Sequence, residues 1–340
     1  MSQAWQFYIA TLIIYAFVYI IAASGLNLQF GVAGIYNFAF IVFQAAGAYT
    51  TAVLSLGPAH TGIQTYILGV HLPFPVPLLV SAVVAGLLGV GLGAVTIRRL
   101  RADYLAIALL VVSLIATDLV TNATSLFDGA TGLSQIPQPF VHLTSSTSGY
   151  DWLYAGFSGL VCAIVLIAVR MIIRSPLGRS LRALRENEHA TAALGKNVAG
   201  MRLFVFGVGG GIAGISGSVL VSFTQAWAPS SWLYGETFVL FTALIVGGVG
   251  SNLGPVLGAL LVPVVLAEGS RYLPAFGAPT LVPSLEWIAI GLILIVFLWF
   301  RPQGVIPEGR RRFSKDWRAV APDAGLRNLV DDEHPGLLTR

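Results

Sequence analysis

Long apolar segments without charge recur along this 340-residue chain, and they constrain its fold more than any other feature. A helix that spans a bilayer needs about 20 mostly apolar residues, and the first charged side chain here is Arg98. One soluble core cannot bury so many apolar runs, and the runs lack the strict alternation of barrel strands. The sequence therefore predicts an all-α, polytopic membrane helix bundle with eight or nine crossings. The predicted crossings are residues 7–28, 35–56, 76–96, 102–121, 155–173, 201–222, 236–249, 253–268 and 286–300.

Lysine and arginine occur in clusters that predict the orientation of the helices. The clusters lie at residues 98–101, 170–202 and 301–312, whereas residues 57–75 and 122–154 contain neither type. Short loops rich in these residues stay in the cytoplasm. If all three clusters are cytoplasmic, the order of the crossings requires an external N-terminus and a cytoplasmic C-terminus. It also requires that the segment at 236–268 enters and returns as a pair. We leave open whether that pair is a full hairpin or re-entrant. No basic region precedes the first run, so we expect it to remain as an anchor.

Two glycine-rich segments interrupt the apolar runs at corresponding places in the two halves. They are residues 27–34 and residues 247–255. Unwound backbone at membrane depth is tolerated only beside a cavity or other protein, so paired interruptions indicate the central pathway of a transporter. Close helix packing is the alternative, because glycine is frequent in membrane helices generally. The pathway interpretation predicts discontinuous helices and pseudo-repeated halves.

The candidate pathway residues are small or polar side chains at and near these interruptions. Asp118 is added because it lies deepest of the acidic residues in the apolar runs, where carboxylates are costly and often functional. A proton-coupled secondary carrier that uses Asp118 is therefore an alternative. Histidine, cysteine and acidic residues show no metal-ligand spacing, so no metal site is predicted. The full candidate set is Asn27, Gly31, Gly34, Asn37, Gln44, Asp118, Gly248, Gly250, Ser251 and Asn252.

Residues 175–195 in the internal basic loop have the signals of an amphipathic surface helix. Ser175 can cap its start, Pro176 suits the first helical position, and Gly195 suits the left-handed position after the last turn. Arg182 and Glu186 have the spacing of a supporting ion pair. The pattern fits docking to a partner and contact with anionic lipid equally well. Its apolar stripe is Leu177, Leu181, Leu184 and Leu194.

The chain has no nucleotide-hydrolysis motif. A Walker A loop needs Gly-Lys followed by Ser or Thr, but Lys196 precedes Asn and Lys315 follows Ser. If ATP drives this protein, hydrolysis must occur on another polypeptide. A dinucleotide fingerprint at residues 209–214 lies inside an apolar run, so we interpret it as accidental. We do not expect this chain to be an enzyme.

The segment SPLGRSLRALRENEHATAALGKNV at 175–198 resembles the cytoplasmic loop of LivM-type permeases of branched-chain amino acid ABC transporters. Further strings resemble the same family in the same order. They are SGLNLQFGVAGIYNFAF at 24–40, FDGATGLSQIP at 127–137, GGVGSNLGPVLGALLV at 247–262 and RPQGVIP at 301–307. These matches extend along nearly all of the predicted membrane portion.

The resemblance implies a permease subunit that forms, with a LivH-type partner, a pathway for branched-chain or other hydrophobic amino acids. It implies two ATPase subunits of LivG and LivF type that bind ATP and Mg, and an extracytoplasmic substrate-binding protein. The chain itself is expected to hold no cofactor and to contact membrane lipid but no nucleic acid. The bacterial cytoplasmic (inner) membrane is its implied location. Relatives of this family also move urea and short amides, which remain alternative substrates.

The resemblance also assigns a role to the internal loop. Residues 1–300 are expected to form the permease domain, with a coupling-helix loop at 175–199, and residues 301–340 a cytoplasmic tail. The helix in this loop is expected to move with the ATPases and so shift the balance between inward-open and outward-open states. Its ATPase-coupling residues are implied to be Arg179, Arg182, Arg185, Glu186, Asn187, Glu188, Ala190, Ala193 and Gly195.

Overall fold

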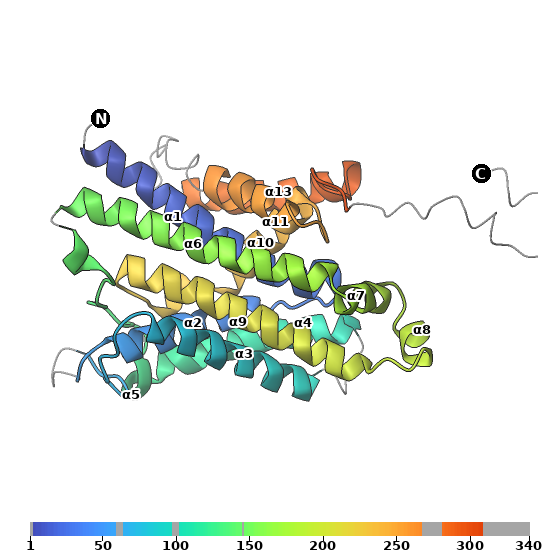
Figure 1. The fold of residues 1–340 in the computed structure, drawn as a ribbon, viewed down its shortest axis with the longest axis horizontal. Coiled ribbons are helices and arrows are strands. Elements are labelled where there is room, and N and C mark those ends of the chain that lie inside the picture. Colours follow the sequence, from blue (N-terminus) through green and yellow to red (C-terminus); the bar gives the residue numbers. More distant parts are fainter. Residues whose placement is uncertain (1–2, 59–63, 97–101, 145, 267–280, 309–340) are drawn as a thin grey trace, which may run out of the picture. The chain divides into compact units, whose positions relative to one another are not determined.

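The computed structural model describes residues 3–58, 64–96, 102–144, 146–266 and 281–308. These residues form helices that run lengthwise beside one another (Figure 1), as the all-α prediction requires. The long helices are α1 (Gln3–Leu26), α2 (Phe40–Ser55), α3 (Val76–Thr96), α4 (Ala102–Asn122), α6 (Thr147–Arg174), α9 (Val198–Thr224), α10 (Tyr234–Gly247) and α13 (Leu281–Phe300). Shorter elements are α5 (Thr124–Phe127), η2 (Val141–Leu143), α7 (Pro176–Glu186), α8 (Glu188–Ala193), η3 (Pro229–Ser231) and α11 (Gly254–Ala259).

Among the described residues, six helical segments are long and apolar enough to cross a membrane. Three shorter apolar segments, Phe40–Ser55, Gly254–Val265 and Ser284–Phe300, correspond to three more of the predicted runs. The chain is thus a multi-pass membrane protein, and the predicted number of eight or nine crossings stays a prediction. The six spans are Trp5–Val32, Val76–Thr96, Tyr104–Asn122, Gly149–Arg174, Val198–Thr224 and Pro229–Gly247.

Helix α9 packs on α1, α2 and α3, and small residues make the contact with α3 possible. A Cβ added to Gly210 would lie 2.8 Å from the carbonyl oxygen of Ala85, and one on Gly211 would lie 3.1 Å from that of Ala82. Such spacing lets two helix backbones approach closely. The glycines of the apparent dinucleotide fingerprint are therefore packing residues inside a helix.

The first interruption is a real break in the helical path. Helix α1 continues into a π-helical turn, η1 (Asn27–Val32), and residues 33–39 are not helical before α2 begins. Gly34 has φ of 72°, a left-handed value that a residue with a Cβ adopts only with strain. The backbone amide of Ile41 donates to Thr237 Oγ1 on α10 at 3.3 Å, which ties the start of α2 to the second half of the chain.

The second interruption separates α10 from α11 at residues 248–253. Helices α10 and α11 pack against each other as the two arms of a hairpin, since a Cβ on Gly258 would collide with the carbonyl of Ala243. The second arm continues as a π-helix, η4 (Leu260–Leu266), where Pro263 supplies no amide hydrogen. The segment thus forms two packed arms up to residue 266, and whether they enter the membrane and return as predicted stays a prediction. Residues 267–280 lie outside the described part.

Helices α7 and α8 stand at one end of the bundle, and the start of α1 stands at the other (Figure 1). We call these the α7 end and the opposite end. Every lysine and arginine in the described ranges falls at or near the α7 end, in residues 170–202 or at Arg301. The predicted basic clusters at 98–101 and 310–312 lie outside the described residues.

Candidate functional site

The predicted loop helix consists of two helices. Ser175 caps α7 by accepting a hydrogen bond from the Gly178 amide at 3.3 Å, as expected. The prediction of one helix over 175–195 was wrong, because Asn187 has an extended backbone and caps the start of α8. Its Oδ1 accepts a hydrogen bond from the Ala190 amide at 3.0 Å. Asparagine is among the best N-cap residues, so it ends one helix and begins the next. Gly195 has the expected left-handed conformation, with φ of 73°.

One face of this helix pair is buried and the other is exposed. Leu181 and Leu184 are buried and Leu177 packs against the core, as the stripe predicted. Leu194 is 78% exposed, because the turn at Asn187 takes α8 out of line with α7. Six of the nine expected coupling residues are exposed and leave a face free for a partner. They are Arg179, Glu186, Asn187, Ala190, Ala193 and Gly195.

The other three expected coupling residues bind within the chain. The predicted pair of Arg182 with Glu186 is replaced, because Arg182 lies 3.6 Å from the Glu308 carboxylate and donates to Ile173 O at 3.0 Å. Arg185 is 2.7 Å from the same carboxylate. Glu188 is held by Arg202 of α9 at 2.6 Å. These side chains hold the loop to the bundle.

Residues 301–308 form a connection that we call the clasp. The amides of Val305 and Ile306 donate to the carbonyls of Val246 and Gly247 at 2.8 and 3.0 Å. The clasp thus satisfies carbonyl groups at the end of α10, where helices leave acceptors unpaired. The start of the predicted tail is joined to the helical unit in this way, and the rest of it, 309–340, lies outside the described residues.

The two interruptions meet beside α7. The Asn27 side chain, which is 1% exposed, donates to Ser251 O at 3.0 Å and accepts from the Gly250 amide at 2.9 Å. Arg185 donates to the carbonyl of Gly31 and so joins α7 to the first break. We call this contact the break junction. The two breaks are thus packed against each other there.

Further contacts of the candidate set lie around the junction. Ser251 Oγ accepts from the Gly254 amide at 2.7 Å and caps α11. Gly248 has φ of 121° and lies against the clasp, where a Cβ would collide with Ile306 O. Asn252 Oδ1 is buried and has no partner in the described part of the chain.

The non-helical stretch after the first break is held by a buried amide pair. Asn37 donates to Gln29 Oε1 at 2.8 Å and accepts from the Ala39 amide at 3.0 Å. Gln29, which is fully buried, donates to Val205 O of α9 at 3.4 Å. Buried polar groups need such partners, so Asn37 is bound in a network that fixes the stretch to α9.

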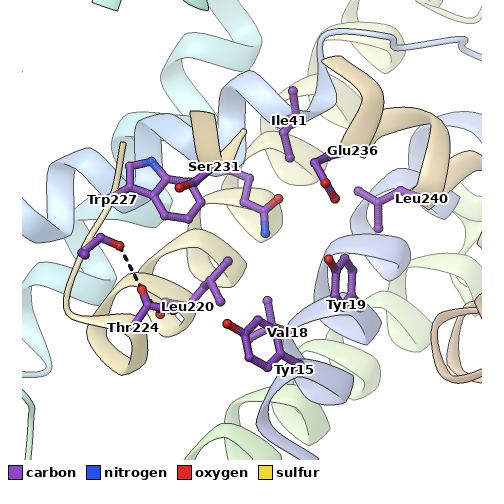
Figure 2. A pocket seen from close by; sticks show the side chains of 12 residues that line it. Tyr15, Val18, Tyr19, Ile41, Leu220, Thr224, Trp227, Ser231, Glu236 and Leu240 are labelled. Carbon is purple, nitrogen blue, oxygen red and sulfur yellow. Dashed lines mark hydrogen bonds between the residues drawn. The ribbon is translucent and has the colours of Figure 1, made fainter. Parts of the chain in front are cut away.

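A cavity of about 220 Å³ lies between α1, α2, α9 and α10, on the opposite-end side of the break junction. Figure 2 shows Tyr15, Tyr19, Trp227 and Glu236 around one space, with the Glu236 carboxylate and the Tyr19 hydroxyl pointing toward each other. Its walls mix polar and aliphatic groups. They comprise Tyr15, Val18, Tyr19, Ile41, Gln44, Leu220, Thr224, Ala226, Trp227, Ser231, Glu236 and Leu240.

Gln44 is the candidate pathway residue that lines this cavity. Its Nε2 donates to Ser216 Oγ at 2.9 Å, and Ser216 donates to Val18 O at 3.0 Å. Asp118, by contrast, lies on the exposed face of α4 and is not among the residues that line the cavity or form the junction. Groups of three or more potential metal ligands are absent from the described residues.

Several residues of the site were missed from the sequence. Glu308 lies in a segment interpreted as a tail, and Glu236 is an acidic residue of a predicted crossing that was passed over in favour of Asp118. Gln29 lies inside the first interruption, and this position was the one feature of the sequence that could have identified it as a site residue. Arg202 stands in the basic cluster, but its pairing with Glu188 depends on the fold.

The comparisons with known proteins give one consistent result. Residues 8–298 match the family model described as branched-chain amino acid transport system, permease component. The chain is 30% identical to the high-affinity branched-chain amino acid transport permease LivM of Salmonella typhimurium, over 86% of this chain and 68% of the relative. It is 26% identical to a probable LivM of Methanocaldococcus jannaschii, over 88% of this chain and 93% of the relative. It is 25% identical to a probable LivH of the same organism, over 86% and 90% respectively. No solved structure matches the chain.

Proposed function

Because this chain belongs to the family of branched-chain amino acid transport permease components, we propose that it is one of two permease subunits of an ATP-driven importer. Its partner is a LivH-type permease, and the likeness of this chain to LivH proteins fits a pair of related subunits. Separate ATPases of LivG and LivF type bind ATP and Mg, and an extracytoplasmic binding protein delivers the substrate. The substrates are branched-chain or other hydrophobic amino acids, as the names of the relatives suggest.

The bridge made by Arg185 is the observation that carries this proposal. Arg185 lies on α7 and contacts both Gly31 of the first break and Glu308 of the clasp. The clasp is bonded to the end of α10, next to the second break. A displacement of α7 therefore cannot leave either break unchanged. An ATPase that moves α7 can shift the balance between two arrangements of the breaks, because it binds them unequally.

The exposed face of α7 and α8 is the docking surface for the ATPases in this proposal. The exposed residues of this face are mostly small or charged, and they include Arg179, Glu186, Ala190 and Ala193. From the positive-inside rule we infer that the α7 end faces the cytoplasm, which is the side that holds ATP, and that the membrane is the bacterial inner membrane. The cavity then lies toward the exterior, where the binding protein delivers substrate.

Ala193→Asp tests the docking role. Ala193 is exposed, so the variant is expected to fold normally, since such surface substitutions change stability by about 0.5 kcal/mol or less. A buried charge at an ATPase interface costs far more. We expect the complex with Ala193→Asp to lose bound ATPase and ATP-dependent leucine uptake in proteoliposomes.

The matched control is Leu143→Asp, at a position that is 70% exposed in η2, four residues before α6 begins. It should retain ATPase and uptake. Equal ATPase retention by the two variants would contradict the docking role. Uptake driven by a proton gradient without ATPases would instead support a secondary carrier, and uptake of urea in place of leucine would change the substrate class.

A further inference from the structure

We propose that the cavity is a substrate site in which Glu236 receives the ammonium group of an α-amino acid. This inference rests on the proposed function, because it names the place inside the permease where the imported solute binds. The cavity of about 220 Å³ is smaller than the roughly 300–1,000 Å³ pockets that hold drug-sized ligands. Its size therefore suits a solute as small as a single amino acid.

The charged groups at the cavity favour a cationic ligand. Glu236 brings a carboxylate to the wall, and Glu286 of α13 lies close enough to interact with it electrostatically. None of the described residues that line the cavity is lysine or arginine. A partly buried carboxylate is costly without a positive partner. A substrate ammonium group supplies that partner, and the neutral tyrosine hydroxyls do not.

The remaining walls suit the rest of such a solute. Val18, Ile41 and Leu220 present aliphatic surface, which favours a branched apolar side chain. Trp227, which is 3% exposed, also lines the cavity and adds aromatic surface to this wall.

The position of the cavity connects it to the break junction. Glu236 lies in the first turn of α10, and the second break begins where the same helix ends. Tyr19 and Asn27 lie on one continuous helical path, about two turns apart. A rearrangement of the breaks would therefore move both walls of the cavity. This arrangement allows the coupling at α7 to change access to the substrate site.

The test is chemical protection of a cysteine placed at the cavity. Ser231 is exposed and lines it, so Ser231→Cys is combined with Cys162→Ala, which removes the one native cysteine. The assembled importer is kept without ATP and labelled with a thiol reagent. We expect L-leucine and 3-methylbutylamine, which both carry an ammonium group, to slow labelling. We expect 4-methylpentanoate, which has the same branched chain and a carboxylate but no ammonium group, to leave it unchanged.

Adding Glu236→Gln should raise the leucine concentration for half-protection by about tenfold or more, since a hydrogen bond to a charged group is lost. Asp151→Asn is the matched control, because Asp151 is a carboxylate near the start of α6 that does not line the cavity. It should leave protection unchanged.

Equal protection by 4-methylpentanoate and leucine in the Ser231→Cys protein that keeps Glu236 would overturn the proposal, even if Glu236→Gln failed to assemble. Unchanged protection by leucine in a folded Glu236→Gln variant would also overturn it, and so would no protection by leucine at all. These readings need no ATP hydrolysis. Failure of ATP-dependent uptake with normal protection would contradict the proposed importer and leave the substrate site standing.

Discussion

At the scale of single residues, the break junction depends on the absence of side chains. A Cβ on Gly31 would lie 2.6 Å from the Gly250 amide nitrogen and would collide with the Asn27 side chain. Asn27 could not then hold the second break, and its buried amide would lose partners that are worth about 1–3 kcal/mol. The glycine allows the two halves of the chain to meet.

Gly31→Ala should therefore destabilise the protein by about 1–3 kcal/mol, the usual cost of an overpacked core. The measurement is the apparent melting temperature of the purified complex, which should fall by several degrees. Gly156→Ala is the control, because a Cβ there meets nothing within 4 Å and alanine favours helix. A Gly31→Ala complex as stable as the Gly156→Ala complex would show that the junction can relax.

The sequence predicted several residues of the site but few of their partners. The two interruptions were recognisable in the sequence, since each places several glycines together with polar residues between apolar runs. That Asn27 bonds to Ser251 O could not be read from the sequence, because the two residues are separated by 224 positions. Asp118 was chosen for its depth in an apolar run, yet depth says nothing about which face of α4 it occupies.

At the scale of elements, Glu308 joins the clasp to α7 through two ion pairs. Its carboxylate lies 3.6 Å from Arg182 and 2.7 Å from Arg185, and all three side chains are about a quarter exposed. Partly exposed ion pairs contribute only about 0–1 kcal/mol to stability. Their position matters more, because they join α7, the helix proposed to receive motion from the ATPases, to the helix that ends at the second break.

Glu308→Gln should therefore leave stability nearly unchanged but lower the amount of leucine transported per ATP hydrolysed severalfold. The readout is uptake and phosphate release in the same proteoliposomes. Arg174→Gln removes one exposed charge at the same end and should leave that ratio intact. A normal ratio in the Glu308→Gln complex would mean that the clasp does not transmit motion.

Element boundaries were predictable where the sequence carries local signals. Ser175 and Gly195 mark the start and end of the internal loop helices correctly. The division at Asn187 was missed, although asparagine is a strong N-cap, because the arginine and leucine pattern suggested one continuous helix. The clasp was missed for another reason: its backbone pairs with α10, and polar composition cannot reveal such pairing.

At the scale of the whole molecule, the described basic residues gather at one end of the bundle, which predicts the orientation in the membrane. The opposite end has the start of α1 and η2, and the α7 end has the exposed Leu194. If the α7 end is cytoplasmic, its surface meets the ATPases and the cavity opens toward the binding protein. The reverse orientation would separate α7 from ATP and exclude the proposed coupling.

Two cysteine variants distinguish these orientations in intact cells. Leu194→Cys and Leu143→Cys each replace a leucine that is at least 70% exposed. Each is made with Cys162→Ala, which removes the native cysteine. A membrane-impermeant maleimide should label Leu143→Cys in intact cells but reach Leu194→Cys only after the membrane is opened. Labelling of Leu194→Cys in intact cells would place α7 outside and refute ATP coupling through that helix. Labelling of both would show that the membrane was not intact, which a cytoplasmic cysteine protein detects in the same sample.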